Sequence, residues 1–291
     1  MSPFDYKFLC GLLKERSGLM LAEDKEYLVE ARLMPVARRA GCGSIAELVR
    51  RLRAPEGEAL IVEVVEAMMI NESFFFRDRL PFDRLRDTVL PALIAVRAAT
   101  RRLRIWSAGS STGQEPYSLA MLLKEFAPQL ADWTVEILAS DISKEVTEKA
   151  RAGLYTQFEV QRGLPIHLLM THFERSNDQW RIAADVREMV RFRQQNLLDD
   201  FSALGRFDVV FLRNVLIYFD PATKADVLQR VADVLVPDGY LLLGAAETVV
   251  GVSDHFQTLA DRQGLYMPKR IGLPAPRLRA IEGGLRAQPA A

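Results

Sequence analysis

Short apolar runs alternate with helix-like segments from about Arg104 onward, and this alternation constrains the fold of the chain more than any other feature. Runs typical of buried strands lie at 103–107, 135–140, 190–196, 207–213 and 240–244. Helical patterns between them run from about Gly113 to Phe126, Lys144 to Ala152 and Pro221 to Val236. Apolar strands that alternate with helices are covered on both faces, so the pattern predicts an α/β fold with a mostly parallel sheet.

The rest of the chain divides around this α/β pattern. Residues 1–90 carry apolar side chains at helical spacing without strand alternation, which predicts an N-terminal helical domain and its linker. The α/β domain is expected at 91–270, with a short β-subdomain inserted at about 154–188, where pieces such as QWRIAA interrupt the alternation. The stretch 271–291 is rich in Pro, Gly, Ala and Arg without an apolar period, so we expect a disordered tail.

The composition favours a globular, cytoplasmic protein. Of 291 residues, 49% are hydrophobic, and the 38 basic residues equal the 38 acidic ones, so no overall field attracts nucleic acid or an anionic membrane. The N-terminus lacks a targeting pattern, and the apolar stretches are too short for membrane insertion. Cys10 and Cys42 provide neither a disulfide framework nor a metal site, so both are expected to be small core residues. A monomer without bound metal is expected.

The loop after the first strand indicates a bound ligand. Six small residues, AGSSTG at 108–113, lie where a parallel strand ends, and such sheets bind ligands at this edge. Gly109 and Gly113 permit close approach of the backbone. Thr112 and Glu115 also match a capping box, in which case Glu115 merely caps the next helix. No lysine follows Gly113 and a third glycine is missing, so the loop is neither a P-loop nor a complete dinucleotide fingerprint.

Polar side chains follow the other strands of the predicted sheet. Asp141 ends the second strand and is suited to accept hydrogen bonds from both hydroxyls of a ribose, although a helix N-cap is its alternative role. Asn196 follows the third strand, and Arg213 and Asn214 follow the fourth. Four strand ends with loop glycines or polar groups on one rim predict a nucleoside pocket.

The segment INESFFFRD at 70–78 is unusual because three consecutive phenylalanines cannot share one buried stripe of a helix. At least one is expected to face a ligand or an interface, unless all three pack between the helical and the α/β parts. Asn71, Ser73 and Arg77 lie close by and favour a segment that closes over the pocket.

These motifs together resemble one known family. NESFFFRD, RIWSAGSSTGQEPYSLAM, ASDIS, FLRNVLIYFD and LVPDGYLLLGAAET are similar to the signature series of the chemotaxis receptor methyltransferases of CheR type, in the right order from about Phe4 to Lys269. The resemblance implies a small helical domain before a Rossmann-like domain that binds S-adenosylmethionine and releases S-adenosylhomocysteine. It also implies the substrate, since glutamates in the cytoplasmic helical region of methyl-accepting chemoreceptors become methyl esters for sensory adaptation.

The resemblance assigns individual site residues. Those expected to surround the cofactor are Asn71, Ser73, Arg77, Gly109, Glu115, Asp141, Asn196, Leu197, Arg213 and Asn214. Glu115 is suited to the ammonium group of the methionyl arm, for which the small residues of 108–113 leave room. Tyr218 is expected near the methyl group, and Arg77 and Tyr218 are the candidates for holding the acceptor carboxylate. The sequence departs from the family at Gln114, where a second glutamate is common, and at Ser73, which keeps the hydroxyl of the more usual threonine.

The implied chemistry requires placement more than proton transfer. A glutamate with an unperturbed pKa of about 4.3 is already charged at neutral pH, so no general base is needed. The enzyme has to place this carboxylate in line with the methyl group and remove part of its water. Residues 31–53 hold six arginines against the single acid Glu47, an excess suited to docking an acidic receptor helix, although a solvated helix face is the alternative.

Two other functions remain open at this point. An NAD-dependent oxidoreductase shares the sheet topology, but the third glycine and an obvious hydride-relay residue are missing. A non-catalytic adaptor that binds receptors and keeps the fold is the other alternative. The intact Arg77, Glu115 and Asp141 argue against such a decayed enzyme.

Overall fold

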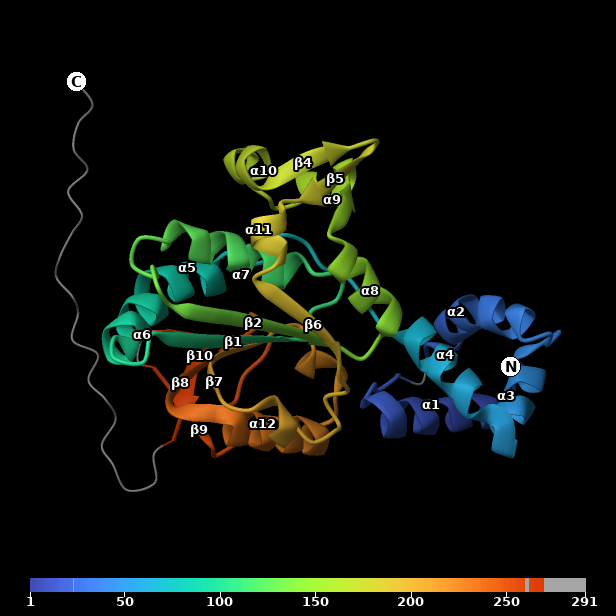
Figure 1. Cartoon of the computed structure of the whole chain (residues 1–291). Helices are drawn as coiled ribbons and strands as arrows, with labels where there is room; N and C mark the ends of the chain where they lie inside the picture. The colour runs from blue at the N-terminus through green and yellow to red at the C-terminus, as the bar shows by residue number, and fades with distance from the viewer. Residues whose placement is uncertain (23, 260–261, 270–291) are drawn as a thin grey trace.

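Two lobes are visible in the computed structural model, which describes residues 1–22, 24–259 and 262–269 (Figure 1). The smaller lobe consists of α1 (Pro3–Ser17), α2 (Glu26–Arg39), α3 (Ile45–Leu52), the 3-10 turn η1 (Pro55–Gly57) and α4 (Glu58–Met68). Their apolar faces share one core, in which Cys42 is buried as expected, whereas Cys10 is only half-buried because it lies at the edge of that core. The tail predicted at 271–291 lies outside the described residues.

The larger lobe is built on a seven-stranded sheet in the order β6-β2-β1-β7-β8-β10-β9. Its strands are β1 (Arg102–Ala108), β2 (Thr134–Asp141), β6 (Val190–Gln194), β7 (Phe207–Leu212), β8 (Leu235–Leu243), β9 (Phe256–Thr258) and β10 (Leu265–Pro268). The first five in this order are parallel, whereas β10 is antiparallel to β8 and β9 to β10. The alternating pattern predicted the parallel part and missed the two short antiparallel strands β10 and β9 at one end of the sheet.

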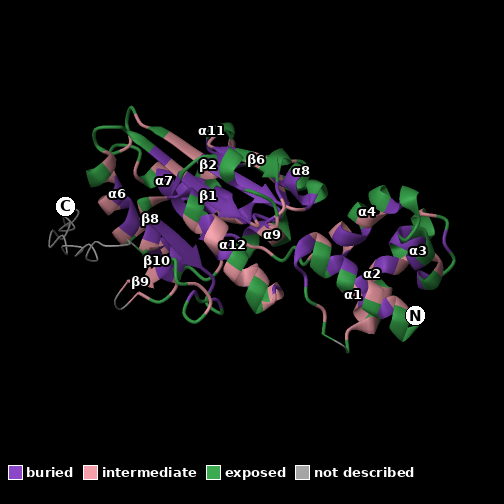
Figure 2. Ribbon diagram, turned by 90° about the horizontal axis from the view of Figure 1, so that it is seen from below, coloured by how far each residue is buried: buried purple, intermediate pink, exposed green. Residues whose placement is uncertain are grey.

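Helices cover both faces of the sheet because strand side chains alternate between its two sides. Ile105 of β1 packs in a cluster with α7 (Gln114–Glu125), whereas the adjacent Trp106 packs in a second cluster with α12 (Pro221–Val234). Figure 1 shows α7 and α12 on opposite sides of the sheet. Buried residues concentrate along the strands between these layers (Figure 2). This arrangement confirms the α/β prediction, and α8 (Lys144–Ala152) has the predicted bounds.

The chain passes from the core of the helical lobe to the core on the sheet between Met68 and Phe75. Residues 80–97 form α5 (Leu80–Arg84), the π-helical segment η2 (Leu85–Val89) and α6 (Leu90–Arg97). Their buried side chains, among them Phe82 and Leu93, belong to the cluster on the sheet and not to the core of the helical lobe. We therefore propose a division of the chain just after α4 rather than near residue 90.

A three-stranded antiparallel sheet lies between α8 and β6 in the sequence. Its elements are β3 (Leu154–Thr156), α9 (Gln157–Gln161), α10 (Ile166–His172), β4 (Phe173–Ser176), β5 (Gln179–Ile182) and α11 (Ala184–Arg187). The chain is thus a Rossmann-like α/β domain with a small N-terminal helical domain and a short inserted β-subdomain. Within the described residues, no helix has the length and apolar character that crossing a membrane requires.

Candidate functional site

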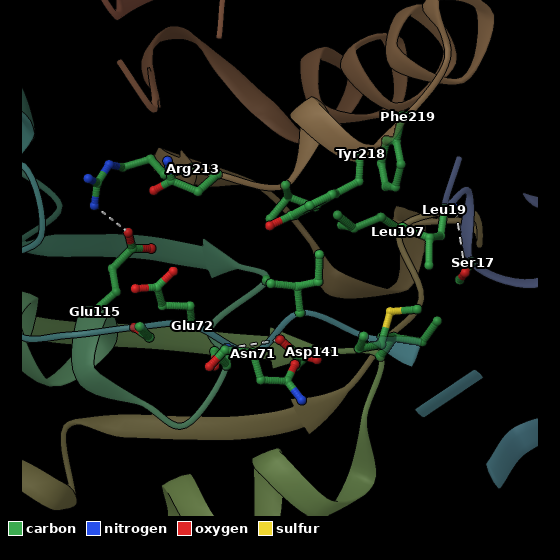
Figure 3. A pocket seen from close by; sticks show the side chains of 18 of the residues that line it. Ser17, Leu19, Asn71, Glu72, Glu115, Asp141, Leu197, Arg213, Tyr218 and Phe219 are labelled. Carbon is green, nitrogen blue, oxygen red and sulfur yellow. Dashed lines mark hydrogen bonds and ion pairs between the residues drawn. The ribbon is translucent and has the colours of Figure 1, made fainter. Parts of the chain in front are cut away.

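The strand order places a ligand site at the carboxyl ends of β1 and β7. From β1 the chain continues to β2 on one side, and later returns to β7 on the other, so the topological switch point lies between them. A pocket lies there, between the strand ends, the segment after α4 and the end of α1 (Figure 3). Clefts at such switch points are where α/β sheets of this kind bind small molecules and cofactors.

Every residue that the sequence assigned to the cofactor lines this one pocket. The set is Asn71, Ser73, Arg77, Gly109, Glu115, Asp141, Asn196, Leu197, Arg213 and Asn214. Tyr218 lines it as well. The fold therefore brings together side chains from the linker, from four strand ends and from the segment after β7.

The loop after β1 brings its backbone to the pocket through a sharp turn. Gly109 has a φ of 77°, and a Cβ at this position would lie 2.4 Å from the Cγ2 of Val215. Only glycine fits both the conformation and the space. The amides of Gly109 and Ser110 donate to the carbonyl of Ser140 at 2.8 and 2.9 Å, which fixes the loop to the end of β2.

Asp141 presents a buried carboxylate at the end of β2. Its Oδ2 accepts the amide of Ser111 at 2.8 Å and its Oδ1 accepts the amide of Ser143 at 3.1 Å. Burial raises the pKa of the Asp141 carboxyl, and these amide bonds act in the opposite direction. The alternative N-cap role is wrong, because the hydroxyl of Ser143 caps α8 by accepting the amide of Val146. Each oxygen of Asp141 retains a lone pair for a further donor.

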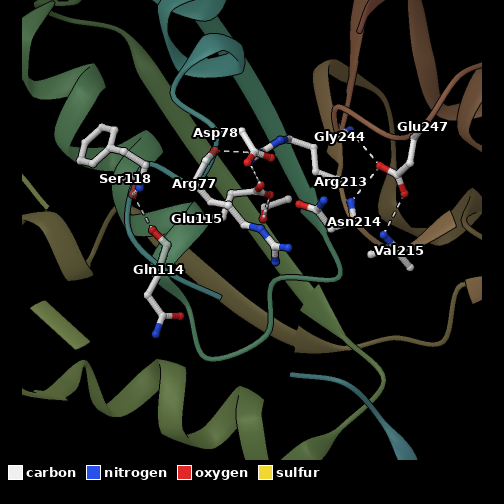
Figure 4. A network of polar contacts seen from close by, with 12 residues as sticks. Arg77, Asp78, Gln114, Glu115, Ser118, Arg213, Asn214, Val215, Gly244 and Glu247 are labelled. Carbon is white, nitrogen blue, oxygen red and sulfur yellow. Dashed lines mark hydrogen bonds and ion pairs between the residues drawn. The ribbon is translucent and has the colours of Figure 1, made fainter. Parts of the chain in front are cut away.

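The buried Arg213 forms an ion pair with Glu115, which is largely but not fully buried (Figures 3 and 4). The Nη1 of Arg213 lies 2.7 Å from Glu115 Oε2, while its Nη2 lies 2.9 Å from Asp78 Oδ2 and 2.6 Å from the carbonyl of Arg77. The hydroxyl of Ser107 donates to Glu115 Oε1 at 2.8 Å. The Nε of Arg213 is a buried donor for which the described residues offer no acceptor.

These partners explain why the predicted capping box at 112–115 does not form. α7 begins after Gly113 without a side-chain cap, and the Thr112 hydroxyl donates to the side chain of Gln114 instead. The carboxylate of Glu115 bonds to a guanidinium 98 positions along the chain. A bond between two opposite charges gains a Coulomb attraction that a carboxylate bond to a neutral backbone amide lacks.

The loop after β7 is fixed by a carboxylate from the end of β8. Glu247, which is buried, accepts the amides of Gly244 at 2.8 Å, Asn214 at 2.8 Å and Val215 at 2.9 Å (Figure 4). Asn214 has a φ of 58°, a left-handed conformation that asparagine tolerates better than most residues. Glu247 therefore holds the predicted cofactor residue Asn214 at the pocket, a role that no sequence pattern indicated.

The three phenylalanines after α4 have different environments. Phe75 is fully buried and Phe76 half-buried, and both belong to the hydrophobic cluster on the sheet. Phe74 contacts two guanidinium groups, those of Arg77 and Arg162, at 5.6 and 4.5 Å from its ring centroid. The alternative that all three pack between the helical and α/β parts is therefore wrong.

Tyr218 reaches the pocket from η4 (Leu216–Tyr218), a short 3-10 turn after β7, and its hydroxyl points inward (Figure 3). Burial raises the pKa of the phenol, and the nearby charge of Arg77 acts in the opposite direction. The hydroxyl is therefore protonated at neutral pH. Asn196 donates from its side-chain amide to the carbonyl of Arg16 at 2.7 Å, so it also ties the end of α1 to the rim of the sheet.

Part of the pocket wall was not identified from the sequence. Ser17 and Leu19 come from the end of α1, and Glu72 and Phe219 stand beside predicted residues. Gly18 marks the end of the first helix in the sequence, but no local signal shows that this end reaches the sheet. A contact between residues about 200 positions apart depends on how the lobes pack.

Comparison with known proteins identifies the family. Residues 71–265 match the CheR methyltransferase SAM binding domain, and residues 5–69 match the CheR methyltransferase all-alpha domain. A chemotaxis protein methyltransferase of Vibrio parahaemolyticus is 40% identical over 269 residues, which cover 91% of this chain and 96% of the relative. Chemotaxis protein methyltransferase 1 of Pseudomonas aeruginosa is 41% identical over 266 residues, covering 90% and 96%.

These matches cover both lobes and contain the motifs in the expected order. They exclude the alternative of an NAD-dependent oxidoreductase. The SAM binding domain spans the strand ends that form the pocket. The chain therefore belongs to the CheR family of chemotaxis methyltransferases, and its cofactor is S-adenosylmethionine.

Proposed function

We propose that this protein transfers the methyl group of S-adenosylmethionine to the side-chain carboxylate of glutamates in the cytoplasmic helical region of chemoreceptors. The observation that carries the proposal is that no histidine, lysine or cysteine is found among the described residues lining the pocket. Each of the carboxylates has a partner: Glu115 pairs with Arg213, Asp141 with two amides, and Glu72 with Arg162 at 2.5 Å. The pocket therefore suits an acceptor that arrives already ionised, as glutamate does.

The residues present fit the cofactor. We assign the ribose hydroxyls to Asp141, whose oxygens have acceptor capacity left. The methionyl arm carries an ammonium group, which we assign to Glu115. The carboxylate of the same arm is assigned to the unpartnered Nε of Arg213. When bound, the cofactor supplies an electrophilic methyl group on a positively charged sulfur. The pocket residues orient it and keep water away from the acceptor.

Arg77 and Tyr218 are the groups proposed to hold the acceptor carboxylate. Arg77 donates through Nη1 to the carbonyl of Glu72 at 2.8 Å, which leaves its other N–H groups for an incoming anion. Tyr218, at the end of η4, adds one neutral hydrogen-bond donor. Arg77 would attract the acceptor carboxylate through its charge, and the hydrogen bond from Tyr218 would orient it for attack.

The helical lobe is proposed to bind the receptor. Of the six arginines within 31–53, five are exposed, whereas Arg32 donates to the carbonyls of Met68 and Met69. The exposed arginines are Arg38, Arg39, Arg50, Arg51 and Arg53. Their charge is complementary to an acidic receptor helix and would orient it before transfer.

The decisive assay combines the protein with receptor membranes and methyl-labelled S-adenosylmethionine. We expect label in the receptor that mild base releases as methanol, which is the signature of a carboxyl methyl ester. Receptor in which the acceptor glutamates are replaced by alanine is the control. Absence of label with several receptors, despite cofactor binding, would favour the non-catalytic adaptor.

Tyr218→Phe is expected to lower kcat about tenfold or more while cofactor affinity stays within about twofold, because the phenol hydrogen bond is made to the aligned acceptor. Arg77→Ala is expected to weaken binding and turnover together, since its charge contacts both partners. Steady-state kinetics on native receptor and calorimetry with the cofactor measure the two effects. Normal turnover of Tyr218→Phe would make the hydroxyl a bystander.

The rate of transfer is expected to be independent of pH from about 6.5 to about 9. The acceptor glutamate is ionised throughout this range, and the raised pKa of Tyr218 keeps its hydroxyl protonated. Single-turnover rates in a series of buffers measure the profile. A rise of rate through about pH 6.5 would indicate a histidine-like base and contradict the proposal.

A further inference from the structure

The turn that ends α1 lies directly against the segment that carries Tyr218. The amide of Met20 donates to the carbonyl of Tyr218 at 2.9 Å. The Nζ of Lys14 lies 2.6 Å from Asp220 Oδ2, and the other oxygen of Asp220 caps α12 by accepting the amide of Thr223. The first helix and its turn thus contact the other lobe at two points, the carbonyl of Tyr218 and the residue that caps α12.

Gly18 is the point of closest fit in this contact. It has a φ of 76°, and its amide donates to the carbonyl of Lys14 at 2.9 Å, which ends the helix. A Cβ on Gly18 would lie 2.9 Å from both Cδ1 and Cε1 of Phe219, and 3.3 Å from Cγ2 of Thr223. Because Phe219 directly follows Tyr218 and is itself buried, a push on its ring moves the backbone of η4.

We propose that the turn 17–20 is a positioning element for Tyr218, and that Gly18 is the residue on which its fit depends. The inference rests on the proposed role of Tyr218 in methyl transfer. Glu247 fixes the start of the loop at Asn214 and Val215. The contact from the turn after α1 fixes its other end, at Tyr218. The phenol bond weakens steeply when its angle or length changes, so a small displacement of η4 is enough to slow transfer.

This element ties the lobe proposed to bind receptor to the residue proposed to act in transfer. Ser17 and Leu19 flank Gly18 and line the pocket itself, and Leu19 is buried. The helical lobe therefore supplies part of the site as well as a docking surface.

The test compares Gly18→Ala with Gly251→Ala. Gly251, in the loop after β8, also has a left-handed conformation, with a φ of 73°, but a Cβ there would meet nothing within 4 Å. Both substitutions impose a similar backbone strain, and only the first pushes on Phe219. We expect kcat to fall about fivefold or more in Gly18→Ala and to stay within about twofold in Gly251→Ala, with cofactor affinity little changed in both. Thermal unfolding of each variant confirms that it is folded.

Two further measurements isolate the path through Tyr218. Gly18→Ala added to Tyr218→Phe is expected to cause little further loss, because both act on the same hydrogen bond. Amide hydrogen exchange at 215–219 is expected to be faster in Gly18→Ala than in Gly251→Ala.

Equal kcat and equal exchange in the two glycine variants would overturn the inference. A full additional loss of rate in the Tyr218→Phe background would also overturn it, because Gly18 would then act elsewhere. If Tyr218→Phe turns over normally, the proposed role of Tyr218 fails by itself. Exchange at 215–219 then decides whether the turn holds η4: faster exchange in Gly18→Ala supports it and equal exchange rejects it.

Discussion

Arg213→Met is expected to lower the free energy of unfolding by about 3–5 kcal/mol, the range for removing one partner of a buried ion pair. The side chain of Arg213 is 1% exposed and that of Glu115 is 13% exposed. Methionine fills much of the volume but leaves the largely buried carboxylate of Glu115 with only the hydroxyl of Ser107 as a donor from the protein. Guanidinium chloride titration of the protein without cofactor measures the loss.

Two variants make this result interpretable. Arg86→Met removes an arginine whose ion pairs with Asp83 and Asp87 are exposed, so it is expected to cost less than about 1 kcal/mol. Glu115→Gln in the Arg213→Met background is expected to recover part of the stability, because the unpaired buried charge is gone. A loss for Arg213→Met no greater than for Arg86→Met would mean that water solvates Glu115.

Asp141→Ala is expected to weaken binding of S-adenosylmethionine and of S-adenosylhomocysteine by roughly 1–3 kcal/mol, about 5- to 150-fold. The substitution removes the proposed acceptor of the ribose hydroxyls and leaves the amides of Ser111 and Ser143 without their acceptor. Calorimetric titration with both ligands measures the change. The effect should be equal for the two ligands, since they share the ribose.

Asp200→Ala is the matched control for this experiment. Asp200 also accepts the amide two residues ahead, that of Ser202, at 3.0 Å, but it is exposed and does not line the pocket. Asp200→Ala therefore removes a similar hydrogen bond to a backbone amide but removes no proposed contact with the cofactor. Unchanged affinity in Asp141→Ala would reject the ribose assignment.

The sequence predicted the elements whose signals are local or repeated. Apolar alternation located the parallel strands, and the rule that ligands bind at their carboxyl ends brought Gly109, Asp141 and Arg213 to one rim. The resemblance added Tyr218 and the linker residues, and all of them line the same pocket. The residues at the strand ends come together because sheet topology determines which strand ends are neighbours, whereas the roles of all these residues in binding stay predictions.

Features that depend on distant partners were not predictable in this way. The capping box at 112–115 had the right letters, but Glu115 bonds to Arg213 instead. The antiparallel strands β9 and β10 are three and four residues long, too short for a periodic signal. Glu247 gave no signal because its three amide donors lie on segments that become adjacent only in the folded sheet.

The segment from Asn214 to Tyr218 is anchored at both ends by groups outside it, Glu247 at the start and the amide of Met20 at the end. Between these anchors, Ile217 is 42% exposed, and its side chain makes neither of the two anchoring contacts. A substitution of Ile217 therefore changes the surface beside the pocket while the hydroxyl of Tyr218 keeps its place. Substitutions at such an exposed position can therefore alter what a partner meets beside the pocket without altering the group proposed to act in transfer.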